Sequence, residues 1–243
     1  MRFAFISDIH ANLEALEAVL ADIDKKKADE ILCLGDVVGY GANPNECAEI
    51  IIKRCKEVLL GNHDAAATNL LTTQHFNVHA KIAIEWTAQA LTQSNKLYLA
   101  KLPISKKTDL LTMAHSTPYE PGLWYYITSL EEAAFNFQYF DTKICLVGHT
   151  HIPMIIVLDD DEIYVHPEKQ ISYNEDDKIK LLINIGSVGQ PRDRNPESSY
   201  GILDTEEKTF TLYRIPYDIP KAQSKMKKIK MPDFLVNRLA EGR

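Results

Sequence analysis

The sequence predicts an α/β protein in which two β-sheets pack face to face and helices cover their outer faces. Two observations lead to this prediction. Short apolar strands alternate with amphipathic helices over the first half of the chain, and the second half is a series of short strands followed by two helices. Because no linker, repeat or low-complexity segment interrupts the 243 residues, we expect residues 1–243 to form a single domain.

The elements of the first half follow from hydrophobic periodicity and from helix-capping residues. Asn12 is expected to cap a helix over 12–23, and Asn43 followed by Pro44 is expected to open a helix that ends near residue 55. Further helices are expected over 78–91 and 129–140. The expected strands are short apolar runs, and they cover residues 2–7, 30–35, 57–61, 109–115 and 143–149.

The second half contains strands separated by polar turns. Strands are expected over residues 154–158, 162–166, 179–185, 199–204 and 209–215. The acidic run 159–162 lies between the first two of these strands, and we expect it to form a solvated hairpin turn. A lysine-rich helix over 221–230 and an amphipathic helix over 232–242 complete the chain.

The composition argues against several classes of protein. The chain has a net charge of −7, with 45% hydrophobic and 25% charged residues, which disfavours non-specific binding to nucleic acid or anionic membranes. No apolar run approaches the ~20 residues of a membrane helix, and a strand from residue 2 leaves no room for a signal peptide. The four cysteines have neither metal nor disulfide spacing, so we expect reduced thiols and a cytoplasmic protein.

Residues that can bind metal ions follow five of the expected strands. These residues are Asp8, His10, Asp36, Asn62, His115, His149 and His151. Ligand sites in open α/β sheets form beyond the carboxyl ends of strands, so we expect them to meet in one crevice. Carboxylate, amide and imidazole ligands without a thiolate suit Mn, Fe, Zn, Ni or Co better than Ca. Asp36, which follows Gly35, is the best candidate for a carboxylate that bridges two metals.

These motifs resemble those of the calcineurin-like metallophosphoesterases. The segments DIH (8–10), GDVVGYG (35–41), GNHD (61–64), AHS (114–116) and GHTHIP (148–153) follow the order found in that family. The segments GYGANPNEC, INIGSVGQPRDRNP and PYD further resemble small bacterial and archaeal phosphodiesterases, including diadenosine-tetraphosphatase-like members. The resemblance extends from Met1 to about Pro216 and implies a four-layer α/β/β/α sandwich of two packed mixed sheets flanked by helices.

The resemblance also implies a role for each polar residue. One metal would be held by Asp8, His10, Asp36 and His151, and the other by Asp36, Asn62, His115 and His149. His63 would be the catalytic histidine, and Asp64 would orient it. The implied cofactors are two divalent transition-metal ions, with Mn²⁺ as the expected metal and Fe, Zn, Ni or Co as alternatives.

The implied activity is that of a metal-dependent phosphoric ester hydrolase, a phosphodiesterase or phosphatase. In-line attack of a metal-bridging hydroxide would cleave a small phosphodiester or a nucleotide phosphoester, and His63 would protonate the leaving group. The alternatives are a metal-dependent protein phosphatase and a non-catalytic protein-binding scaffold of the same fold. The scaffold is disfavoured because His63 and every ligand position are present. The expected partner is a small phosphoester or nucleotide, with no membrane and no stable nucleic-acid binding, and no oligomeric state is predicted.

Two further features concern the substrate. Arg192, in GQPRDRN (189–195), is expected to contact a phosphate through its guanidinium. The alternative is that Arg192 is a surface arginine, and this is what we expect of Arg194. The segment PGLWYY (121–126) could stack on a nucleobase or aryl group, or could fill space beneath a loop. The histidines without strand-end context are expected to lie outside the site, and these are His75, His79 and His166.

Overall fold

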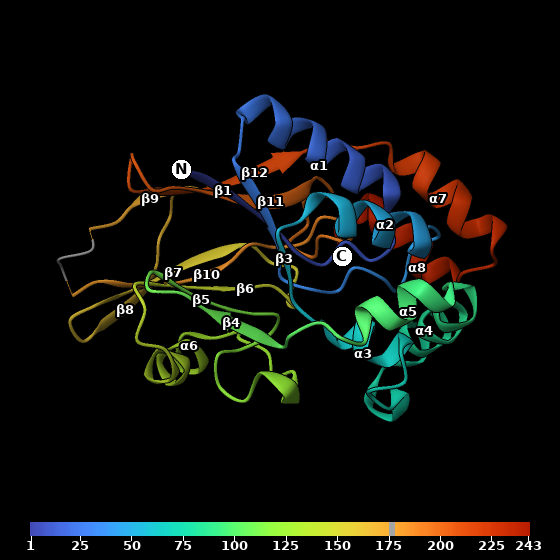
Figure 1. The fold of residues 1–243 in the computed structure, drawn as a ribbon, viewed down its shortest axis with the longest axis horizontal. Coiled ribbons are helices and arrows are strands. Elements are labelled where there is room, and N and C mark those ends of the chain that lie inside the picture. The colour runs from blue at the N-terminus through green and yellow to red at the C-terminus, as the bar shows by residue number, and fades with distance from the viewer. Residues whose placement is uncertain (175–177) are drawn as a thin grey trace.

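Two mixed six-stranded sheets form the centre of the molecule in the computed structural model, which describes residues 1–174 and 178–243 (Figure 1). The first sheet has the order β3-β2-β1-β11-β12-β9. Its strands are β1 (Arg2–Ile6), β2 (Glu30–Cys33), β3 (Glu57–Val58), β9 (Gln170–Ser172), β11 (Ser198–Asp204) and β12 (Thr209–Ile215). The second sheet has the order β4-β5-β6-β10-β7-β8. Its strands are β4 (Ser105–Lys107), β5 (Leu111–Ala114), β6 (Ile144–Val147), β7 (Met154–Asp159), β8 (Glu162–Val165) and β10 (Lys180–Asn184).

Parallel strands occupy the middle of both sheets. β1, β2 and β3 run parallel to one another in the first sheet, and β5, β6 and β10 do so in the second. The loops that follow β1, β2, β3, β5 and β6 therefore leave parallel strands at their carboxyl ends. These are the loops that carry the predicted metal ligands.

One hydrophobic core lies between the two sheets and another lies between the first sheet and its helices, because side chains alternate along each strand. In β1, Phe5 points toward the second sheet, whereas Ala4 and Ile6 point toward the helices. Phe5 packs against Phe210 of β12 with ring centroids 6.3 Å apart, and both side chains are fully buried.

Helices cover the outer faces of both sheets, and this arrangement confirms the predicted four-layer sandwich. The buried faces of α1 (Leu13–Lys26) and α2 (Pro44–Arg54) pack on the first sheet, and α6 (Leu130–Asn136) packs on the second. The other helices are α3 (Asn62–Ala67), α4 (Val78–Ala90), α5 (Gln93–Leu99), α7 (Ile219–Lys228) and α8 (Asp233–Glu241), with 3₁₀ turns at Thr73–His75, Pro121–Leu123 and Phe137–Tyr139. No helix within the described residues is long and apolar enough to cross a membrane.

Most predicted elements are present, and the exceptions have local causes. The strand expected over 57–61 ends at Val58, because the Leu60 N–H donates to the Pro103 carbonyl instead of to the sheet. Asn12 caps α1 as predicted, but the Asn43 side chain makes no capping hydrogen bond to α2 and instead donates to Glu46. The short elements α3, α5, β4 and β9 were not predicted, whereas the hairpin turn at 159–162 is confirmed.

The C-terminal helices are tied to the first half of the chain. The nearly buried carboxylate of Glu14 lies 2.6 Å from Lys225 Nζ and 3.3 Å from Lys221 Nζ, which joins α1 to α7. From α8, Leu235 packs in the same hydrophobic cluster as Tyr40, which belongs to the loop after β2. These contacts hold α7 and α8 against the helical side of the first sheet (Figure 1).

Candidate metal centre

The structure brings all seven predicted metal ligands together at the strand ends. Asp8 and His10 follow β1, Asp36 follows β2, and the remaining ligands come from α3 and from the loops after β5 and β6. Their exposed fractions range from 0 to 7%. Three groups of side chains place their ligand atoms within 4.8 Å of one another, namely Asp8–His10–His151, His10–Asp36–His63 and Asp36–His115–His149.

Asp36 lies between the two halves of this cluster. Its Oδ2 atom is 3.6 Å from His10 Nε2 and 3.4 Å from His115 Nε2. The Oδ1 atom of Asp8 lies 3.2 Å from His151 Nε2 and 3.7 Å from His10 Nε2. The Nε2 atoms of His10 and His151 are 3.1 Å apart. The carboxylate of Asp36 thus faces a histidine on each side.

Each carboxylate is fixed by a main-chain N–H that binds one oxygen and leaves the other facing the histidines. The His63 N–H donates to Asp36 Oδ1 at 2.8 Å, and the His149 N–H donates to Asp8 Oδ2 at 3.0 Å. Such hydrogen bonds set the orientation of a metal ligand before the metal binds. The structure therefore fixes both carboxylates without using the oxygens that face the cluster.

The imidazoles are oriented in a similar way. Nδ1 of His10 lies 3.1 Å from the Val38 carbonyl, and Nδ1 of His115 lies 3.0 Å from the Leu34 carbonyl. His149 differs, because its Nε2 lies 3.0 Å from the Trp124 carbonyl and its Nδ1 is left as the remaining ring nitrogen. A carbonyl partner fixes the tautomer and makes the opposite nitrogen an electron-pair donor.

Several buried atoms of the cluster have no hydrogen-bond partner among the described residues. They include Asn62 Oδ1 and His115 Nε2. Buried polar groups are normally paired, so atoms left unpaired in a polar cluster indicate a missing partner such as an ion. Together with the mixed oxygen and nitrogen donors, these atoms fit a transition-metal site.

The backbone that presents these side chains is held in an uncommon conformation. Five of the seven ligands have left-handed φ angles, namely Asp8 (52°), His10 (50°), Asp36 (52°), His149 (67°) and His151 (63°). Non-glycine residues seldom adopt this region, and such strain concentrates at functional sites. Gly61 allows the close packing, because a Cβ atom there would collide with the Asp36 carboxylate and main chain.

Burial and the two carboxylates set the protonation of the cluster. Burial raises the pKa values of Asp8 and Asp36, but the neighbouring imidazoles outweigh it and lower both pKa values below the ordinary range. Burial lowers the pKa of His115, but Asp36 and Asp8 reverse this and raise it to about 9. Burial is the main reason that the pKa values of His10, His63, His149 and His151 are lowered. At neutral pH the chain alone therefore carries one ligand proton, on His115.

His63 lies beside the cluster, and the hydrogen bonds of its neighbour Asp64 go to the main chain. The Asp64 carboxylate accepts hydrogen bonds from the main-chain N–H groups of Val37, Val38 and Gly61. His63 Nδ1 has no hydrogen-bond partner among the described residues, and its ring packs on Tyr40 at 4.5 Å. The sequence left open whether Asp64 touches His63 directly, and in α3 the carboxylate turns toward the backbone that it caps.

A pocket of about 580 Å³ opens over Asn62, His63 and His149, and we refer to it as the metal pocket. Arg192 and Tyr40 line it, as do Phe76 and the aromatic residues Trp124 and Tyr126. Arg192 donates to Gln190 Oε1 at 2.8 Å, and its guanidinium lies 5.8 Å from the centre of the Tyr40 ring. By contrast, Arg194 is exposed and is not among the lining residues.

Some residues of the pocket were not singled out from the sequence. Tyr40 and Phe76 contact the His63 ring, and His75 lines the pocket although it was expected to lie outside the site. The only sequence signal for Tyr40 is its position between two glycines, while the segment around Phe76 has no motif. His79 and His166 lie elsewhere, as expected, with His79 stacked on Phe234 and His166 beside the Gln170 carbonyl.

Comparison with known proteins identifies the family. The calcineurin-like phosphoesterase superfamily domain matches residues 1–208. The chain belongs to this superfamily. The protein is a metal-dependent phosphoester hydrolase. This assignment disfavours the alternative of a non-catalytic scaffold.

Relatives of this phosphoesterase cover nearly the whole chain. Protein MJ0912 of Methanocaldococcus jannaschii is 39% identical over 99% of this chain and 98% of its own length. Phosphodiesterase YfcE of Escherichia coli is 26% identical over 85% of this chain and 89% of its own length. A metallophosphoesterase structure from Sphaerobacter thermophilus is 37% identical, with a TM-score of 0.87 over 100% of this chain and 99% of that one. The structure of protein PH1004 from Pyrococcus horikoshii, 18% identical, has the same fold, with a TM-score of 0.81 over 100% and 98% of the two chains.

The protonation of His115 predicts how metal binding depends on pH. A metal ion must displace the ligand proton, so loading at pH 7 should release about one proton per chain, and affinity should rise about tenfold per pH unit until pH about 9. Calorimetry in two buffers of different ionisation enthalpy measures the proton count. His115→Gln should weaken binding and remove the proton release. Release of no proton by the unaltered protein at pH 7 would contradict this prediction.

Proposed function

We propose that this phosphoesterase holds two divalent transition-metal ions and hydrolyses small phosphodiesters or nucleotide phosphoesters. The observation that carries the proposal is the position of Asp36 Oδ2, within 3.6 Å of His10 Nε2 and 3.4 Å of His115 Nε2. Asp36 belongs to two of the three ligand groups, which supports a carboxylate shared between two ions. Asp8, His10 and His151 would complete one site, and Asn62, His115 and His149 the other.

Two divalent ions at these positions would activate a water molecule for attack on phosphorus and would stabilise charge on the phosphoryl oxygens. Mn²⁺ suits the mixed donors, as do Fe, Zn, Ni and Co. With a charge of +4 from two ions and −2 from Asp8 and Asp36, the site would carry about +2 inside a chain of net charge −7. The charge would attract a small anionic ester.

His63 is proposed to protonate the leaving oxygen. It lines the metal pocket, and burial lowers its pKa to about 4 in the chain alone. The negative charge of a phosphoester bound beside the ring would offset part of the positive charge of the ions and favour the imidazolium, which would give its proton to the leaving oxygen. Asp64 would act through the main chain, because it accepts hydrogen bonds from the N–H groups of Val37 and Val38, in the loop after β2, and of Gly61, at the start of α3. It thereby joins the loop after β2 to the segment that carries His63.

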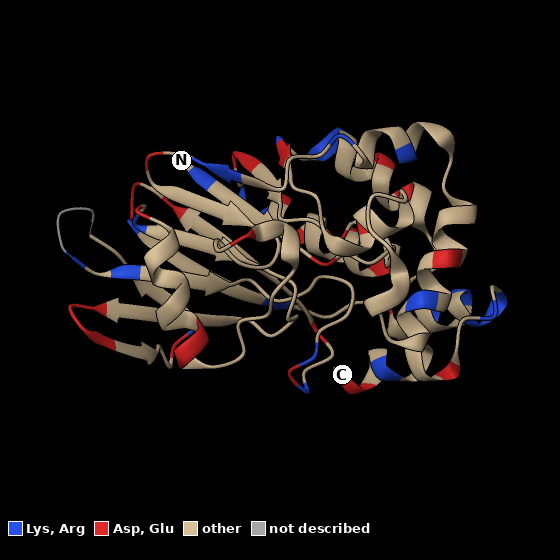
Figure 2. Cartoon of the chain, turned by 90° about the horizontal axis from the view of Figure 1, so that it is seen from below, with Lys and Arg blue, Asp and Glu red and all other residues tan. Residues whose placement is uncertain are grey.

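The pocket and the surface charge support a small substrate. A volume of about 580 Å³ suits a small-molecule ligand. In Figure 2, Lys and Arg (blue) lie in several separate places along the chain among Asp and Glu (red). The net charge of −7 disfavours a nucleic-acid ligand. The relative YfcE is named a phosphodiesterase, which also favours a diester substrate. The four cysteines are free thiols, which supports our proposal that the protein is cytoplasmic.

Metal content tests the shared carboxylate. Asp36→Ala should lose both ions, whereas His151→Ala should mainly weaken one, as measured by elemental analysis of dialysed protein. Because Asp36 also accepts the His63 N–H, Asp36→Asn provides a variant that keeps this acceptor, and circular dichroism checks the fold. The proposal of a bridging Asp36 is wrong if Asp36→Ala keeps two ions at unaltered affinity.

The role of His63 is tested with leaving groups of different basicity. His63→Gln should keep fold and metal, while the rate for a poor leaving group should fall by roughly 10²–10⁴. The loss should be smaller for p-nitrophenolate, which leaves without full protonation. His75→Gln is the matched control, because this histidine lines the same pocket but is exposed. Equal losses on both substrates would point to positioning instead of proton transfer.

Arg192 is expected to contact the substrate phosphate, and more strongly when a second phosphate is present. Arg192→Ala should keep the metal content and lower kcat/KM roughly 10- to 150-fold, the effect of losing a hydrogen bond to a charged group. The loss should be larger for a dinucleoside polyphosphate than for a simple aryl diester, and Arg192→Lys should restore part of it. Arg194→Ala, in the same loop but exposed, is the control. Unchanged kinetics on both substrates after Arg192→Ala would contradict this role.

A further inference from the structure

A second pocket, of about 570 Å³, lies next to the metal pocket and is lined mainly by aromatic rings. We refer to it as the aromatic pocket, and its rings belong to Tyr119, Trp124, Tyr125, Tyr126 and Phe135. Glu131 and Glu132 of α6 also line it. The reaction proposed above uses none of its polar groups.

The two pockets share a wall. Trp124 and Tyr126 line both of them. The Tyr126 ring stacks on the His149 ring at 4.1 Å, and the Trp124 carbonyl lies 3.0 Å from His149 Nε2. A ligand that touches Tyr126 from the aromatic pocket is therefore separated from a candidate metal ligand by one ring.

The rings are exposed yet held in a fixed arrangement. Tyr125, Tyr126 and Phe135 are 48%, 51% and 43% exposed. Tyr119 stands nearly parallel to Tyr125, at 12° and 6.1 Å, and meets Phe135 edge-on at 4.9 Å. Exposed apolar groups gathered in one place indicate a binding surface, and ordered aromatic rings favour a flat ligand. The exposure of these rings argues against the alternative that the segment only fills space beneath a loop, because rings with that role would be buried.

We propose that the aromatic pocket binds the nucleobase of a nucleotide phosphoester whose scissile phosphate lies in the metal pocket. This inference rests on the proposed function and names its substrate class. Stacking between a base and protein aromatic rings is a common and sequence-tolerant mode of recognition. In this arrangement, the scissile phosphate would contact Arg192 and the metal ions, and the base would lie against the rings around Tyr125.

The carboxylates favour a base over a second phosphate or a plain aryl group. Hydrogen bonds from the main chain and from Ser129 lower the pKa of Glu131, and those from Thr128 lower the pKa of Glu132. Both are therefore ionised at neutral pH, which disfavours an anion in this pocket. Glu132 Oε2 already accepts from Thr128 and Ser129 at the start of α6, so in this carboxylate Oε1 is the oxygen left for a ligand. A carboxylate oxygen accepts hydrogen bonds from the N–H groups that nucleobases carry and that plain aryl rings lack.

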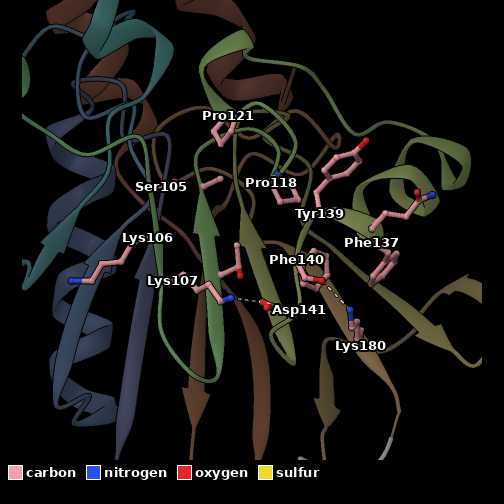
Figure 3. Close-up of a pocket in the computed structure, with 13 residues that line it drawn as sticks. Ser105, Lys106, Lys107, Pro118, Pro121, Phe137, Tyr139, Phe140, Asp141 and Lys180 are labelled. Carbon is pink, nitrogen blue, oxygen red and sulfur yellow. Dashed lines mark hydrogen bonds and ion pairs between the residues drawn. The ribbon is translucent and has the colours of Figure 1, made fainter.

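A neighbouring hollow of about 680 Å³ differs in the charge of its lining, because three lysines and one aspartate line it (Figure 3). Figure 3 shows Lys107 directed at Asp141 and Lys180 directed at the main chain of Phe140. Lys107 Nζ lies 2.5 Å from the Asp141 carboxylate, and Lys180 Nζ donates to the Phe140 carbonyl at 2.9 Å. Its cations are thus engaged within the protein. Tyr139 lines this hollow and packs on Tyr119 at 4.5 Å, which supports the aromatic pocket from behind.

Trp124 provides a direct readout of binding. The chain has two tryptophans, so Trp86→Phe leaves Trp124, in the shared wall, as the only one. Adenosine, which has no phosphate, should change the Trp124 fluorescence saturably, and metal-free protein should respond in the same way. Adding Tyr125→Ala should weaken adenosine binding roughly 5- to 150-fold, the range measured for base–aromatic stacking. Tyr164→Ala, an exposed tyrosine of β8, is the matched control and should change nothing.

Kinetics of the metal-loaded protein give the second test. Tyr125→Ala should raise KM for a dinucleoside polyphosphate at least fivefold and leave KM for a glycerol phosphodiester, which has no aromatic ring, unchanged. If the loaded protein hydrolyses no phosphoester, the proposed function fails, while the adenosine titration still tests the pocket. The inference is overturned if adenosine leaves Trp124 unaffected, or if Phe76→Leu weakens adenosine binding and Tyr125→Ala does not. It is also overturned if Tyr125→Ala changes only the sedimentation of the protein, which would make the rings an interface between copies.

Discussion

The burial of two carboxylates side by side is the constraint on which the rest of the site depends. Asp8 and Asp36 are almost completely inaccessible to solvent, and His10 Nε2 lies 3.7 and 3.6 Å from their nearest oxygens. Two like charges in such a place are costly unless positive charge is supplied. In the chain alone, one proton on His115 supplies part of it. Divalent cations would supply the rest, so the same burial that makes these side chains costly on their own would favour metal binding.

The backbone stabilises this arrangement locally. Main-chain N–H groups of His63 and His149 bind one oxygen of each carboxylate, and carbonyl groups hold the outer nitrogens of the imidazoles. The left-handed residues that make these contacts possible are each costly, by about 1–3 kcal/mol. The sandwich core of fully buried side chains such as Phe5 and Phe210 provides the stability that offsets this strain.

Periodicity and motif spacing predicted the fold class, the long elements and the convergence of the strand ends. They failed where three-dimensional packing decides. The strand that begins at Glu57 is shortened because the Leu60 N–H donates to the Pro103 carbonyl. The hydrogen-bond partners of Asp64, which the sequence left open, are main-chain donors from two separate loops. The partners of these groups are distant in sequence, so no local pattern identifies them. The aromatic segment at 121–126 was visible in the sequence, but its exposure and its shared wall with the metal pocket were not.

The pairing of β1 determines when the site can form during synthesis. This strand carries Asp8 at its end and lies between β2 and β11, with Arg2 opposite Asp204 and Phe5 opposite Gly201. The first ligand to leave the ribosome is therefore fixed in place by one of the last strands, and α1 gains its Glu14–Lys225 contact later still. Loop closure over such separations slows folding. A nascent chain that already contains every candidate ligand up to His151 still lacks β11, the strand that pairs with β1 on the side opposite β2. The sheet beside Asp8 is therefore completed only after the segment that contains β11 has been made.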